Sequence, residues 1–121
     1  MGVKLEAKAE AVAIEFWWKQ VRRYHRLFFR LVDEQAENLH YIPNIELCIN
    51  ILEHSYMQLI RMAYPHEADV IRGYLLSATR HLIDSLRRLR KAQNHESSVM
   101  LNIASGDMAL LRFELMAYGI S

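Results

Sequence analysis

Residues 85–98, SLRRLRKAQNHESS, bring several cationic side chains together and follow them with a histidine. Arg87, Arg88, Arg90 and Lys91 fall within five positions, and His95 comes next. Arginine forks match phosphate oxygens with paired hydrogen bonds, so one interpretation is a surface for a polyanion. An arginine close to a histidine is also the kind of pair that could carry out acid–base catalysis. The third interpretation is a solvated helix face without chemistry.

A second set of cationic residues has helical spacing between Phe16 and Val32, a stretch without Asp or Glu. Its members are Lys19, Arg22, Arg23, Arg26 and Arg30. The first set, extended by one more arginine, comprises Arg80, Arg87, Arg88, Arg90 and Lys91. Together they hold ten of the 15 Lys and Arg residues, although the net charge is only +1. This segregation predicts two basic faces that bind phosphates, provided that carboxylates leave them unneutralised.

The sequence contains few other residue combinations that are typical of catalytic, metal or phosphate-binding sites. Di-iron bundles need a Glu-x-x-His pair on each of two helices, and this sequence does not supply them. His81 and Asp84, one turn apart, are expected at the surface, as are Glu53 and His54. Neither a nucleophilic triad nor a glycine-rich phosphate loop is recognisable, so no cofactor, metal or catalytic residue is predicted.

Composition restricts the class of protein. The chain has 121 residues, of which 52% are hydrophobic and 24% charged, as expected for a single globular domain covering residues 1–121. No apolar run approaches the roughly 18 residues of a membrane span. The first residues alternate Lys and Glu instead of forming the apolar stretch of a signal peptide, so a cytoplasmic location is expected.

Helical periodicity extends through most of the chain, which contains only four Gly and two Pro. The pattern predicts an all-α four-helix bundle with helices at about 5–38, 45–63, 67–93 and 96–118. Pro43 and Asn44 start the second helix, polar residues of the sequence NHESS cap the fourth, and Gly119 follows its end.

The fourth predicted helix is apolar on two sides. One stripe contains Leu101, Ala104, Met108, Leu111 and Leu115, and the other contains Val99, Ile103, Leu110 and Phe113. A single core covers only one of them, so the second stripe is expected to bury itself against another subunit. Gly106, in mid-helix, fits a close approach between helices. Homo-oligomerisation, or membership of a larger complex, is therefore expected.

Two families resemble parts of this chain. The HEPN ribonucleases, small helical dimers, carry an Arg a few residues before a His, as do Arg90 and His95 here, Arg88 and His95, and Arg61 and His66. Residues 66–121, with a basic-tipped helix, a polar loop and the stretch ASGDMALLRFEL, resemble the family of ribosomal-RNA intervening-sequence proteins and retroelement accessory variability proteins. That resemblance implies a ring-like oligomer of bundles that binds nucleic acid beside a reverse transcriptase.

The function expected from these patterns is non-catalytic. The chain is predicted to be an accessory protein or small subunit that contacts the phosphates of RNA or DNA through the basic faces of its first and third helices. Two alternatives stay open: a structural protein–protein interaction module and a HEPN-type ribonuclease.

Overall fold

Helices are the only regular secondary structure in the described part of the chain. This computed structural model describes the backbone of residues 2–37 and 45–120, and the side chains of residues 8–23, 26, 30 and 45–120. Its helices are α1 (Gly2–Glu37), α2 (Ile45–Arg61), α3 (Asp69–Arg90) and α4 (Asn94–Ala117), with a short 3₁₀ helix η1 (His66–Ala68) before α3. The predicted all-α class with four helices is confirmed. The predicted start at Pro43 and Asn44 lies outside the described residues.

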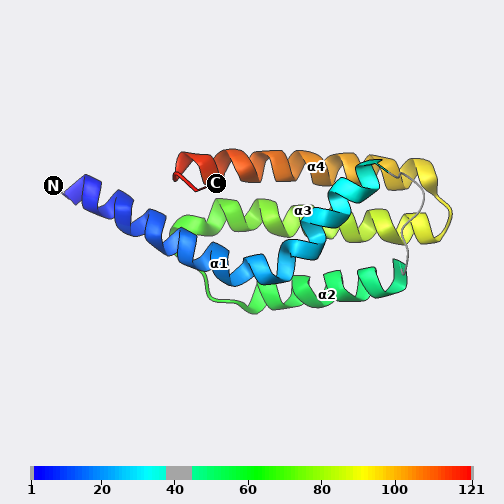
Figure 1. The fold of residues 1–121 in the computed structure, drawn as a ribbon, viewed down its shortest axis with the longest axis horizontal. Helices are drawn as coiled ribbons and strands as arrows, with labels where there is room; N and C mark the ends of the chain where they lie inside the picture. The colour runs from blue at the N-terminus through cyan, green and yellow to red at the C-terminus, as the bar shows by residue number, and fades with distance from the viewer. Residues whose placement is uncertain (1, 38–44, 121) are drawn as a thin grey trace.

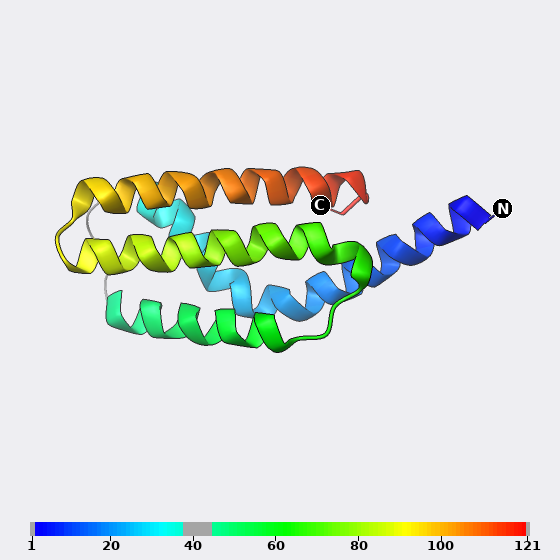
Figure 2. The ribbon, with the colours of Figure 1, turned by 180° about the vertical axis from the view of Figure 1, so that it is seen from behind.

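Three of the helices, α2, α3 and α4, form a layer, and helix α1 crosses it. Helices α2, α3 and α4 run antiparallel to their neighbours, with α3 in the middle (Figure 1). Helix α1 crosses one face of this layer obliquely, and its first turns extend past the end of the layer (Figure 1). Seen from behind, α3 is not covered by another described helix (Figure 2). One side of α3 therefore faces α1, while no described helix covers the opposite side.

Small side chains let α3 and α4 approach closely. Ala78 and Ala104 are fully buried between them, and Ser85 and Ser97 are buried nearer the connecting turn. The Ser85 hydroxyl donates to the Ser97 carbonyl at 2.8 Å, and the Ser97 hydroxyl donates to the Ser85 carbonyl at 2.8 Å. Because each buried hydroxyl has a partner, this polar pair carries little desolvation penalty and fixes the register of the two helices.

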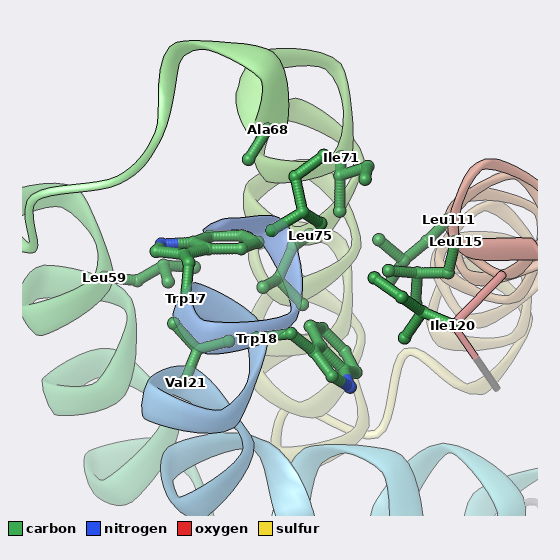
Figure 3. Close-up of a cluster of buried hydrophobic side chains, with 11 residues drawn as sticks. Trp17, Trp18, Val21, Leu59, Ala68, Ile71, Leu75, Leu111, Leu115 and Ile120 are labelled. Atoms are coloured by element: carbon green, nitrogen blue, oxygen red, sulfur yellow. The ribbon is translucent and has the colours of Figure 1, made fainter. Parts of the chain in front are cut away.

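Two tryptophans anchor α1 on the layer. Trp17 and Trp18 are buried, together with Ile14 and Val21 one turn to either side. Figure 3 shows Trp17 beside Leu59 of α2, while Trp18 points toward α4. Burying an aromatic side chain of this size removes a large apolar area from water, so this cluster contributes strongly to holding α1 in place.

The turns differ in part from the prediction. Gly119 has φ 73° and the Ile120 amide donates to the Leu115 carbonyl at 3.0 Å, which is the glycine-terminated helix end expected there. Helix α4 begins at Asn94, two residues earlier than predicted, and no side chain caps its first turn. The reason is that Ala92, at φ 59°, reverses the chain at once.

Candidate nucleic-acid interface

The cationic residues of α1 form one exposed surface, which we call the α1 basic stripe. It consists of Lys19, Arg22, Arg23, Arg26 and Arg30, and all five residues are exposed. The stripe lies on the outer side of the helix because Trp17 and Val21 occupy the buried side. The basic side chains therefore point away from the bundle core.

Part of the stripe has local partners and part has none. Lys19 lies 3.6 Å from Glu15, one turn earlier, as the spacing predicts, and both side chains are more than half exposed. The Arg22 guanidinium lies 6.0 Å from the centre of the Trp18 ring. Among the described residues, no carboxylate forms an ion pair with Arg23 or Arg26. These two guanidinium groups are the parts of the stripe best placed to meet phosphates.

The basic residues of α3 are arranged differently. Arg87 donates to Glu53 at 2.9 Å, and Arg90 donates to both carboxylate oxygens of Glu46 at 3.0 and 2.8 Å. Both glutamates belong to α2. The condition that this face remain unneutralised is therefore not met for these two arginines, because a neighbouring helix supplies carboxylates that periodicity along α3 alone cannot reveal.

The rest of the α3 set is divided in the same way. Arg88 is paired with Asp84 of its own helix at 3.1 Å. Arg80 and Lys91 are exposed, and neither forms an ion pair with a described residue. Of the five residues predicted for this face, only Arg80 and Lys91, at opposite ends of the segment, form no ion pair with a described residue, so the continuous face that was predicted is interrupted.

Helix α4 has an apolar stripe on its outer side, as predicted. Val99, Ile103, Leu110 and Phe113, which we call the α4 outer stripe, are 39, 40, 48 and 69% exposed. The other stripe, from Leu101 to Leu115, is buried. A Cβ built on Gly106 meets nothing within 4 Å among the described residues, so none of the described helices makes the close approach that was suggested for this glycine.

A polar cluster between α3 and α4 has no counterpart in the sequence-based prediction. The Nδ1 atom of His81 lies 3.0 Å from Oδ2 of Asp107, and the Ser77 hydroxyl donates to the same oxygen at 2.9 Å. His81 is therefore half-buried and paired with Asp107, rather than a surface residue beside Asp84. The serine–histidine spacing of one turn was a visible signal, but Asp107 comes from another helix.

This cluster does not have the geometry of a serine nucleophile. In that arrangement the serine and the aspartate contact opposite nitrogens of the imidazole. Here Ser77 and Asp107 both lie on the Nδ1 side, with the Ser77 hydroxyl 3.3 Å from Nδ1. The histidine is held by the aspartate, and its other nitrogen is directed away from the serine.

The remaining candidate residues are dispersed. His95 is exposed in the first turn of α4, whereas Arg88 and Arg90 are paired with carboxylates. Arg61 and His66 are exposed around the α2–η1 turn. Within the described residues no group of His, Cys, Asp and Glu is arranged to hold a metal ion, and Cys48 is a buried free cysteine.

Comparison with known proteins identified no relative. No protein-family model, curated protein or solved structure matches this chain. Helices of the described segments are also too short or too polar to cross a membrane. Function therefore has to be argued from the charge, exposure and packing of this chain itself.

Proposed function

We propose that this protein is a non-catalytic, nucleic-acid-associated accessory protein or small subunit that contacts the phosphate backbone through the α1 basic stripe. The observation that carries the proposal is the exposure of Arg23 and Arg26 on one helix side without a carboxylate partner among the described residues. Exposed arginines of this kind replace the counterions condensed on a nucleic acid, which favours association.

The length and rigidity of the stripe support this role. From Lys19 to Arg30 a helix rises roughly 16 Å, which is comparable to several successive phosphates along a strand. The buried Trp17 and Trp18 fix this part of α1, so little conformational freedom is lost on binding. Because these aromatic rings point into the bundle, they are not available for stacking on bases. The proposed contact is consequently independent of sequence.

Arg80 lies among residues of α2, α3 and α4 on the side away from α1, so the proposed contact does not include it, and Lys91 extends the contact only secondarily. Arg87, Arg88 and Arg90 are held by carboxylates, and releasing a guanidinium from its carboxylate offsets part of any gain from a phosphate. The proposal therefore places the main contact on α1 rather than sharing it equally between α1 and α3.

We also propose that the α4 outer stripe packs against a second copy of the chain. Its members are separated by four, seven and three residues, and Gly106 lies on the same side of the helix between Ile103 and Leu110. The stripe therefore forms a continuous apolar ridge. Gly106, whose added Cβ would touch no described residue, gives that ridge a low point where another helix fits. An oligomer repeats the α1 basic stripe and strengthens binding to a long polyanion.

The binding proposal is tested by charge reversal. Fluorescein-labelled random 20-mers of RNA and of double-stranded DNA are titrated with the protein at about 0.1 M salt. Arg23→Glu with Arg26→Glu is expected to weaken binding of both by at least about tenfold. The matched control, Arg61→Glu with Arg112→Glu, makes the same change in net charge on exposed residues outside the stripe.

A structural interaction module is the second candidate, and the ion pairs of Arg87 and Arg90 favour it. If neither oligonucleotide is retained at moderate salt while light scattering still shows an oligomer, the protein is a helical scaffold and the proposed phosphate contact is wrong. RNA cleavage that His95→Ala abolishes would instead support the ribonuclease interpretation.

A further inference from the structure

A cavity of about 540 Å³ lies on the side of α3 that faces away from α1. Its walls come from three helices: Tyr56 and Met57 of α2, Arg80, His81 and Ile83 of α3, and Met100 of α4. The volume is within the range of about 300 to 1,000 Å³ typical of small-molecule pockets. The lining also includes five charged or titratable side chains, Glu53, Arg80, His81, Asp84 and Arg87, so the cavity suits a ligand with an apolar part and a charged part.

One of these polar groups is held in a defined orientation. Nδ1 of His81 is engaged by Asp107, and Ser77 donates a second hydrogen bond to the same carboxylate oxygen. Asp107 and His81 are only 17 and 26% exposed, so the ring is fixed from the α4 side. Nε2 is then the ring nitrogen left for a molecule in the cavity. Fixing a polar group before binding reduces the entropy that a ligand must overcome.

The cavity also contains one cation without a counterion. Glu53 and Asp84, which line it, are taken by Arg87 at 2.9 Å and Arg88 at 3.1 Å. Arg80 forms no ion pair with a described residue. After these two ion pairs, the charge left in the lining is that of Arg80, which directly precedes His81 in α3.

We propose that this cavity binds a small organic anion with a planar apolar body. The body lies against Met57, Ile83 and Met100, and its carboxylate or phosphate group meets the Arg80 guanidinium. His81 adds a hydrogen bond through Nε2. The site does not depend on the proposed nucleic-acid contact, because the α1 basic stripe lies on the other side of the bundle.

The experiment uses three probes of the same shape on the full-length chain: 1-naphthyl phosphate, 1-naphthoate and the neutral 1-naphthamide. Calorimetric titration is expected to show that at least one anion binds about tenfold or more tightly than the amide. The stronger of the two anions identifies a phosphate or a carboxylate as the group that the site prefers. Equal affinity for all three probes, or absence of binding, would overturn the proposal.

Variants separate the cavity from general charge effects. Arg80→Gln is expected to lower the affinity for the preferred anion about tenfold and to leave the amide unchanged. Arg112→Gln removes an equal charge from an exposed site on α4 and is expected to change neither. Should the two variants affect anion binding equally, Arg80 is not part of a binding site.

Two further measurements test the rest of the pocket. His81→Asn keeps a donor near Asp107 but removes the outer ring nitrogen, so it is expected to weaken anion binding severalfold while the circular dichroism stays unchanged. A random oligonucleotide is expected not to displace the bound anion. Displacement would mean that the probe reports the nucleic-acid surface, and the separate site would then be rejected.

Discussion

Arg90 of α3 donates from Nη1 to both carboxylate oxygens of Glu46 in α2, at 3.0 and 2.8 Å, across 44 residues of sequence. Glu46 lies in the first turn of α2 and Arg90 in the last turn of α3, so each charge also complements the dipole of its own helix. Arg87 and Glu53 repeat the connection further along the same pair of helices. The basic segment of α3 therefore joins two helices rather than presenting a free cationic face.

Replacing Arg90 by alanine is expected to lower the free energy of unfolding by about 0.2 to 1 kcal/mol, since the Arg90–Glu46 pair is partly exposed. The loss is expected to shrink as salt screens the pair. Urea unfolding at low and high salt measures both effects, with Lys91→Ala as the unpaired control. An equal loss in the two variants would contradict a joining role for Arg90.

Leu110→Glu with Phe113→Glu places two charges in the centre of the α4 outer stripe. Both side chains are exposed in the single chain, so the helix content and the thermal stability of the monomer are expected to change little. Association is expected to be lost, because charges buried at an apolar interface are costly. Light scattering should show the monomer mass for this variant and an oligomer for Arg112→Glu. A monomeric wild-type chain would refute the interface.

Gly106→Ala distinguishes the contribution of residue 106 to helix stability from its contribution to association with a second copy. A Cβ at this position meets nothing in the part of the chain that the structure describes, so the substitution is expected to stabilise an isolated chain by about 1 kcal/mol through helix propensity alone. If a second copy crosses at Gly106, the same methyl group weakens association. The effect of Gly106→Ala on the free energy of unfolding is measured in the monomeric Leu110→Glu, Phe113→Glu background. Its effect on the dissociation constant is measured in the otherwise unchanged oligomer. Tighter association of the alanine variant would exclude a crossing there.

Trp17→Ala removes one of the anchors of α1. Trp17 is 2% exposed and packs with Leu59 and Ala68, so its loss is expected to cost about 3 to 5 kcal/mol. Phe16, its neighbour, is 66% exposed, and Phe16→Ala is expected to stay within about 0.5 kcal/mol. Chemical denaturation compares them. Similar costs for the two would mean that α1 is not held by its tryptophan side.

Periodicity was sufficient for the properties that depend on one helix at a time. The spacing of apolar residues correctly predicted that Leu101 and Leu110 lie on opposite sides of α4, the first buried and the second exposed. The Lys19–Glu15 pair is a contact of this kind, because partners one turn apart are set by the geometry of a single helix.

Periodicity within one helix could not predict the contacts between helices. The pairing of Arg90 with Glu46, and of His81 with Asp107, depends on how helices align side by side, which the period of one helix does not determine. The same holds for the oblique position of α1, which leaves one side of α3 open and creates the cavity beside Arg80. The basic residues were located correctly, but their neutralisation required the fold.

The central claim is that Arg23 and Arg26 meet phosphates, and a salt titration of oligonucleotide binding tests it most directly. The logarithm of the affinity for a random duplex is measured against the logarithm of the salt concentration. Arg23→Gln with Arg26→Gln is expected to reduce the magnitude of the slope by about 1.8, or about 1.4 for a single strand, while Arg61→Gln with Arg112→Gln leaves it unchanged. Equal slopes in the two double variants would contradict the claim.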